Sequence, residues 1–219
     1  MNIQECILDN IPVFDVEDGL NEVISVFKTT SFSHIAVTEN KEFLGLLSVN
    51  DLPCFEADKS IEDFRYQLET FFVTPKTLWL DVLEKFSKNE ANLLPVLEEE
   101  SPRIIGYYDL NDIVTLFIGT PFFTEPGGIL VVSKGMKDYS LSEISQIVEG
   151  NNGKLLGAFI TDYQNDLIQV TLKIGNVNLN EVIQTFRRYS YNIVFGNNDD
   201  EFLQDLKERS AYLEKYLNV

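Results

Sequence analysis

The amino-acid sequence predicts a mixed α/β (α+β) protein with a duplicated strand-and-helix unit followed by a smaller βαββαβ unit. Three observations predict this: a pattern that recurs at constant spacing, a stretch rich in proline and glycine, and a new alternation of short elements after it. The predicted domains are residues 1–118 (repeats about 3–60 and 61–118), a linker at 119–127, a second domain at 128–197 and a C-terminal helix at 198–219.

An amphipathic helix is predicted in each repeat. Its apolar stripe consists of Leu20, Val23, Ile24 and Phe27 in the first repeat, and of Trp79, Val82, Leu83 and Phe86 exactly 59 positions later. At the same spacing, each helix follows a short apolar strand and precedes a buried one. These strands are Ile11–Phe14 and His34–Val37 in the first repeat, and Thr70–Val73 and Leu93–Val96 in the second.

A turn of related sequence follows in both repeats, Gly45 to Asp51 and Gly106 to Asp112, now 61 positions apart. The change in spacing reflects a two-residue insertion at 98–101. One repeat is too small to bury both faces of its sheet, so the two copies are expected to pack sheet against sheet.

The turn of the first repeat carries residues suited to a ligand. A strand ends at Leu47 and a helix is predicted from Ser48, which would place the hydroxyl beside unpaired N–H groups, where an anion or phosphate binds well. Asp51 lies about one helical turn further, and its carboxylate could accept hydrogen bonds from a ribose diol. Without a ligand, the same two residues would serve as a helix cap and a first-turn acid, and both interpretations stay open.

Residues 3–118 resemble a pair of CBS domains, also called a Bateman module. The resemblance rests on the duplicated turn and on Leu94-Pro95-Val96, of which Ile35-Ala36-Val37 is a weaker copy. It implies an adenosine-containing ligand (AMP, ADP, ATP or S-adenosylmethionine) in the cleft between the repeats. The residues implied in binding are Ile11, Val13, His34 and Ile35 against the adenine, with Gly45, Ser48, Asp51 and Asp112.

The second repeat departs from this pattern at Asp109, which stands where the first repeat has Ser48. A carboxylate can still cap a helix there, but it would repel a phosphate. Residues 1–120 contain 22 acidic and 8 basic side chains, and this net charge of −14 disfavours a triphosphate unless Mg²⁺ accompanies it. An adenosine-type or monophosphate ligand is therefore expected.

The composition argues against several other classes of protein. A formal net charge of −18 makes binding to nucleic acid or to an anionic membrane improbable, and no apolar run is long enough to span a bilayer. His34 is the one histidine, which excludes a paired-histidine metal site, and no motif indicates a catalytic residue or a required cofactor. Two cysteines, Cys6 and Cys54, fit a reducing compartment, and a cytoplasmic location is expected.

The second domain has the element order βαββαβ, which predicts a ferredoxin-like sandwich. Its predicted strands are Ile129–Val132, Lys154–Thr161, Leu167–Ile174 and Tyr191–Phe195, and its helices carry apolar stripes at 141–148 and 179–186. This order resembles an ACT domain, although Asp138–Leu141 lacks the glycine usual in ACT ligand loops. Amino-acid binding and a dimerisation or packing role both remain open. The combination of domains is similar to bacterial acetoin-utilisation regulator-like CBS proteins.

A regulatory sensor that binds an adenosine-containing ligand and forms a homodimer is the function expected from these features. The alternative is a ligand-free dimerisation or partner-binding module whose nucleotide pocket has degenerated. The helix at 198–219 would dock on its own domain, dock across the dimer or bind an unknown protein partner.

Overall fold

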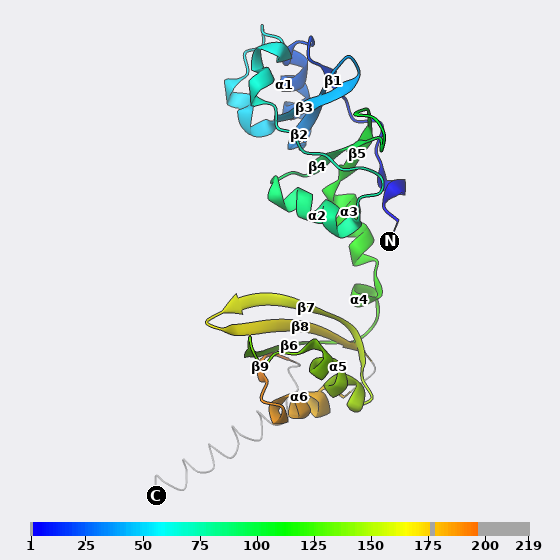
Figure 1. Ribbon diagram of the computed structural model, residues 1–219, viewed down its shortest axis with the longest axis vertical. Helices are drawn as coiled ribbons and strands as arrows, with labels where there is room; N and C mark the ends of the chain where they lie inside the picture. The colour runs from blue at the N-terminus through cyan, green and yellow to red at the C-terminus, as the bar shows by residue number, and fades with distance from the viewer. Residues whose placement is uncertain (1, 176–177, 197–219) are drawn as a thin grey trace, which may run out of the picture. The chain divides into compact units, whose positions relative to one another are not determined.

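A computed structural model describes residues 2–175 and 178–196 (Figure 1). The chain forms two compact units, Met1–Ile118 and Gly119–Val219. The predicted helix at 198–219 lies outside the described residues, as do positions 176, 177 and 197 of the predicted second domain.

The first repeat is a three-stranded sheet covered by helices. Its sheet has the order β1-β2-β3, with β1 parallel and β3 antiparallel to β2. Residues Leu20, Val23 and Phe27 of the predicted stripe are buried against Ile35 and Val37 of the central strand. The elements are η1 (Gln4–Cys6), β1 (Phe14–Asp15), α1 (Leu20–Thr29), β2 (His34–Glu39), β3 (Glu42–Ser48), η2 (Val49–Cys54) and η3 (Ile61–Gln67).

The second repeat reproduces this arrangement with a shorter sheet. It consists of α2 (Trp79–Lys88), β4 (Leu93–Leu97), β5 (Ile104–Asp109) and α3 (Leu110–Ile118). β4 and β5 pair antiparallel, and Val73 forms a parallel bridge with Val96. This bridge is equivalent to the pairing of Phe14 with Val37. Residues 59 positions apart in the sequence therefore form the same strand pairing in both repeats.

Two predicted strands are shorter in the structure than expected, and one predicted helix is of a different type. The predicted strand Ile11–Phe14 is reduced to Phe14–Asp15, and Thr70–Val73 is reduced to the bridge at Val73. In the first segment, Pro12 has no N–H to donate to a neighbouring strand. The helix predicted from Ser48 is the 3₁₀ helix η2, which contains Pro53, whereas its counterpart α3 is α-helical. Proline removes a helical hydrogen bond and disfavours the α conformation in the preceding residue.

Each repeat receives an edge partner from the segment that leads into the other repeat. Leu46 in β3 exchanges two backbone hydrogen bonds with Glu69, of 2.8 and 3.0 Å, and Tyr107 in β5 exchanges two with Leu8, of 2.8 and 2.9 Å. The turn glycines permit this contact. A Cβ at Gly45 would lie 2.7 Å from Leu68 Cβ, and one at Gly106 would lie 2.4 Å from Leu8 O.

The two repeats share one apolar interior. Ala36 and Leu46 of the first repeat are buried in the same cluster as Leu93, Leu94 and Tyr107 of the second. Along β2, this inner face alternates with the face that carries Ile35 and Val37, which packs under the helices of the first repeat. The expected packing of sheet against sheet is therefore present at β2 and β4.

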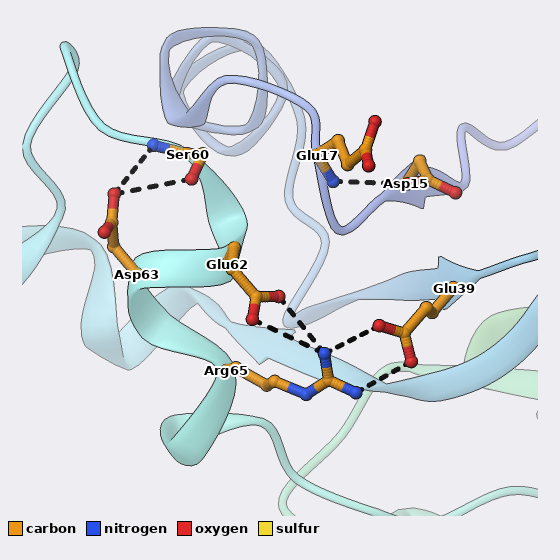
Figure 2. Close-up of polar contacts among 7 residues, drawn as sticks. All are labelled: Asp15, Glu17, Glu39, Ser60, Glu62, Asp63 and Arg65. Atoms are coloured by element: carbon orange, nitrogen blue, oxygen red, sulfur yellow. Dashed lines mark hydrogen bonds and ion pairs between the residues drawn. The ribbon is translucent and has the colours of Figure 1, made fainter.

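An exposed ion-pair network fastens η3 to the first sheet (Figure 2). The Arg65 guanidinium donates from Nη1 and Nη2 to the two carboxylate oxygens of Glu39, at 2.7 Å each, and Nη1 also lies 3.2 Å from Glu62 Oε2. At the start of the same helix, Ser60 and Asp63 form a capping box. Arg65 thus connects the segment that leads into the second repeat to β2 of the first.

The second unit is a ferredoxin-like sandwich, as predicted. Its antiparallel sheet has the order β7-β8-β6-β9, and α5 and α6 cover one face (Figure 1). Ser140 caps α5 by accepting a hydrogen bond from Glu143 N. The elements are β6 (Gly128–Gly135), α5 (Leu141–Gly150), β7 (Lys154–Gln164), β8 (Leu167–Gly175), α6 (Leu179–Arg188) and β9 (Asn192–Phe195). The segment 119–127 contains a short helix, α4 (Pro121–Thr124), whose Phe122 packs on Gly157.

Candidate functional site

The candidate site lies where β2 begins and β3 ends. Antiparallel pairing places His34 directly opposite Ser48, and both residues are buried, with exposed fractions of 3% and 2%. A hydrogen bond of 2.8 Å from Val49 N to Ser33 O closes this end of the ladder. Asp51 follows in η2, near enough for its carboxylate to influence the pKa of His34. The structure therefore brings three of the predicted site residues together.

His34 is held by groups from both sides of the repeat interface. Its Nδ1 lies 2.9 Å from Ser33 Oγ and its Nε2 lies 3.7 Å from Glu69 Oε1. Phe71 contacts the imidazole edge to face, with ring centroids 5.0 Å apart. Burial lowers the pKa of His34, while Glu69 and Asp51 act in the opposite direction. The lowered pKa favours a neutral imidazole at neutral pH, which leaves these two carboxylates without a cationic partner at His34.

Ser48 acts as the cap of η2 by accepting a hydrogen bond of 3.3 Å from Asn50 N. This is the capping role that the sequence left open beside anion binding. Because η2 has six residues and is a 3₁₀ helix, its dipole is weaker than that of the helix predicted there. The hydroxyl, and not the helix end, is therefore the main polar group that this turn offers to a ligand.

The remaining predicted residues of the first repeat occupy different surroundings. Ile11 is half-buried at the margin of the shared interior, and Val13 is 40% exposed. Ile35 is fully buried on the opposite face of β2, beneath α1, and so does not share a face with His34. Gly45 lies against Leu68 and Glu69, which gives it a packing role.

The second repeat offers different chemistry at the equivalent place. Leu93, a fully buried aliphatic residue, lies opposite Asp109, so no imidazole is present there. The Asp109 carboxylate accepts a hydrogen bond of 2.7 Å from Asn111 N in the first turn of α3. Asp112 is half-buried near Cys6, whose thiol pKa is raised by burial and, to a smaller extent, by Asp112 and Glu5. These carboxylates make the second position unsuited to a phosphate.

Sequence reasoning missed Tyr107, which is almost fully buried at the repeat interface. Its hydroxyl accepts a hydrogen bond of 3.0 Å from Ala36 N and donates one of 3.0 Å to Pro12 O. Burial raises the pKa of the phenol well above its ordinary value. The signal was present in the alignment of the repeats, where Tyr107 corresponds to Leu46 and Ala36 to Pro95.

A family model matches residues that lie almost entirely in the first unit. The family model described as CBS domain matches residues 3–52 and again residues 66–119. The first unit is a pair of CBS domains. CBS domain pairs are regulatory modules and often bind adenosine-containing ligands. The match confirms the family inferred from the repeat, although no curated protein matches the chain.

Solved structures with similar folds each cover about half of this chain. A CBS domain pair/ACT domain protein from Thermotoga maritima is 21% identical, with a TM-score of 0.48 over 54% of this chain and 97% of that chain. The CBS domains of a transcriptional regulator from Streptococcus pneumoniae are 12% identical, with a TM-score of 0.46 over 52% and 98%. The cytosolic domain of the Mg²⁺ channel MgtE, solved in complex with ATP, is 18% identical, with a TM-score of 0.42 over 51% and 46%.

The described residues, 2–175 and 178–196, also bear on metal binding and membrane insertion. Within them, no group of three or more His, Cys, Asp or Glu side chains is arranged to hold a metal ion. Within the same ranges, no helix combines the length and apolarity needed to cross a membrane.

Proposed function

We propose that the CBS pair is a sensor that binds an adenosine-containing ligand beside His34, Ser48 and Asp51. The observation that carries this proposal is the pairing of His34 with Ser48 at the repeat interface, with Asp51 nearby. A buried hydroxyl can bond a phosphate or sugar oxygen, a carboxylate can accept from a ribose diol, and the imidazole and Phe71 offer ring edges and faces to a base.

The charge around this position limits the ligand. Asp51 and Glu69 both act on a histidine whose pKa is lowered by burial, and the unit as a whole is strongly acidic. Each added phosphate therefore increases the repulsion that a ligand must overcome. We expect AMP and S-adenosylmethionine to bind more tightly than ADP, and ATP to bind weakly unless Mg²⁺ is supplied.

Regulation would follow from the position of the site between two repeats. Glu69 and Phe71 come from the segment that enters the second repeat, whereas His34 and Ser48 belong to the first. A ligand that contacts both repeats stabilises the relative orientation in which the two sets of contacts are made, and this shift in population is the signal. The ferredoxin-like unit would transmit that signal or reinforce a homodimer.

Isothermal titration of the full chain with AMP, ADP, ATP and S-adenosylmethionine tests the proposal. Asp51→Asn should weaken AMP binding about tenfold or more by removing the charged acceptor for the ribose. The matched control is Asp58→Asn, which changes an exposed aspartate in the turn between η2 and η3. Absence of binding below millimolar concentration, or equal affinities of wild type and Asp51→Asn, would contradict the proposed function.

A second candidate function is supported by Asp109. This carboxylate takes the place of the Ser48 hydroxyl and already accepts a hydrogen bond from Asn111 N, as expected of a pocket that no longer binds phosphate. In that case the chain would be a ligand-free homodimer that binds a partner protein. Analytical ultracentrifugation with and without AMP separates the candidates, because a sensor should change its sedimentation or dimer affinity with ligand.

We also propose that the chain regulates and does not catalyse, that it needs no cofactor, and that it acts in the cytoplasm. The support is the match of residues 3–52 and 66–119 to the CBS domain, which is typically a regulatory module. A hydrolysis assay with adenine nucleotides is the direct check. Turnover that disappears in Asp51→Asn would contradict this part of the proposal.

A further inference from the structure

Tyr107 fills a position in the first repeat where two backbone groups would otherwise be unpaired. Ala36 N–H and Pro12 C=O both point to one phenol oxygen, at 3.0 Å each, although neither pairs with the other. Tyr107 is only 1% exposed and Ala36 is fully buried. Because a buried backbone group without a hydrogen-bond partner destabilises the folded state, the hydroxyl satisfies a requirement of this interior.

The second repeat shows why this requirement is specific to the first. At the position equivalent to Ala36 it has Pro95, which carries no N–H, and the position equivalent to Tyr107 is Leu46, which has no polar group. The pair Pro95 and Leu46 thus lacks both the backbone N–H and the hydroxyl, whereas the pair Ala36 and Tyr107 has both. The Tyr107 hydroxyl is therefore present where Ala36 provides an N–H for it to bind.

The paired backbone groups also have the chemistry that recognises a purine base. Adenine presents an acceptor nitrogen beside its exocyclic amino donor, so one edge can accept from an N–H and donate to a C=O. The Tyr107 hydroxyl performs the same two functions with a single atom. Pro12 lies between Ile11 and Val13, and Ala36 lies two residues after His34 on the same face of β2. Ile11, Val13 and His34 were predicted to line the adenine position.

We infer that Tyr107 is a built-in occupant of the base-recognition position in the first repeat, and that an adenine ligand binds there by displacing it. This inference rests on the proposed function and adds its regulation. The backbone of Tyr107 pairs with Leu8 on the edge of β5, while its hydroxyl reaches β2. Displacement of the side chain therefore breaks a contact between the repeats at the moment when the base makes its own.

The inference is tested by titrating AMP into wild type, Tyr107→Phe and Tyr107→Leu. In both variants the unliganded protein loses the partner of Ala36 N–H, and AMP would restore it, so we expect AMP affinity to rise by about tenfold or more in each. The larger rise is expected in Tyr107→Leu, because the smaller side chain also leaves room for the base. Tyr108→Phe is the matched control, since the buried hydroxyl of Tyr108 has no hydrogen-bond partner among the described residues and should not affect AMP binding.

A second measurement uses the folded wild-type protein. With fluorinated tyrosine incorporated, the ¹⁹F resonance of Tyr107 can be assigned by its loss in Tyr107→Phe, and saturating AMP should move it toward the position of exposed tyrosines. An unmoved resonance in AMP-bound protein overturns the inference.

The possible results separate the inference from the proposed function. If wild type and both Tyr107 variants bind AMP with equal affinity, displacement is wrong and the sensor stands. If only the variants bind, Tyr107 blocks the site and AMP does not displace it, which overturns the displacement. If none binds AMP or S-adenosylmethionine, the proposed function fails, displacement fails with it, and Tyr107 is a structural bridge only.

Discussion

Ser33 and Asn92 occupy equivalent positions in the two repeats, 59 residues apart, and hydrogen bond to each other. Ser33 N donates to Asn92 Oδ1 and Asn92 N donates to Ser33 Oγ, at 2.8 Å in both cases. Because Ser33 Oγ also lies 2.9 Å from His34 Nδ1, this reciprocal contact connects the second repeat to the candidate site. A contact between equivalent residues is the hallmark of a local two-fold relationship.

Asn92→Ala should destabilise the first unit by about 1–3 kcal/mol, because it leaves Ser33 N without its acceptor and removes a donor to Ser31 O. Urea denaturation followed by circular dichroism measures the loss. Asn89→Ala is a suitable control, since within the described part of the chain the Asn89 side chain hydrogen bonds to Lys85 O at its own helix end. Equal losses in the two variants would show that the contact between repeats adds little.

Alanine substitutions at three glycines should have effects of different sign. Gly106→Ala is expected to cost about 2 kcal/mol or more, because φ is +148° and a Cβ would collide with Leu8 O. Gly45→Ala should also destabilise, by contact with Leu68 Cβ. Gly150→Ala meets no atom within 4 Å at the end of α5 and should stabilise by up to about 1 kcal/mol. Thermal melting of the three variants checks the order.

A double-mutant cycle at Ala36 and Tyr107 tests the matched donor and acceptor. Tyr107→Leu alone leaves Ala36 N–H unpaired, whereas Tyr107→Leu in an Ala36→Pro background imitates the second repeat, where no donor exists. We expect Tyr107→Leu to cost about 1–3 kcal/mol less in the proline background. Additive losses, measured by urea denaturation, would mean that the hydroxyl serves only Pro12 O.

The lowered pKa of His34 predicts a loss of stability in mild acid. In the unfolded chain the imidazole titrates at about 6.5, so the unfolded state binds a proton that the folded state resists. Stability is therefore retained above this pH and falls as the pH decreases from about 6.5 toward the pKa of the folded protein. His34→Gln should remove this component, so the gap in melting temperature between wild type and variant should change between pH 7.5 and 5.5. A gap that is independent of pH would contradict the assignment.

The exposed Arg65 network should give a small effect that depends on salt. Arg65→Ala removes the two-pronged contact with Glu39 (Figure 2), and water and ions screen such surface pairs efficiently. We expect a modest decrease in melting temperature at low salt that disappears at high salt. Lys59→Ala is the control for a local pair, because Lys59 contacts Glu56 only three positions away. A decrease that persists at high salt would indicate a packing role for the Arg65 side chain.

Much of the fold could be predicted because its signals are local and repeated. The apolar stripe of α1 recurs in α2, and the turn glycines recur at Gly45 and Gly106, so one copy supports the interpretation of the other. The order of elements in the second unit could be predicted for the same reason, because each strand and helix shows the hydrophobic periodicity of its own type. Pro53 is an exception, since a single residue changed the helix type without changing the pattern.

The candidate site was less predictable because its decisive contacts join distant residues. His34 and Ser48 followed from the pairing of two adjacent strands, but Glu69 reaches His34 only through the exchanged edge segment. The face on which Ile35 lies depends on the register of β2, and one step along a strand reverses it. Tyr107 lies 71 positions from Ala36, and its role depends on an unpaired N–H that only the packed repeats reveal.

The exchange of edge segments also sets an order of events during synthesis. The first repeat lacks Ile61, Phe64 and the backbone partner of Leu46 until the ribosome has made residues 61–69. The segment around Leu8 is made before the rest of the pair, and its partner in β5 is translated about a hundred residues later. The backbone pairing of Leu8 with β5 can therefore form only after Tyr107 has left the ribosomal exit tunnel.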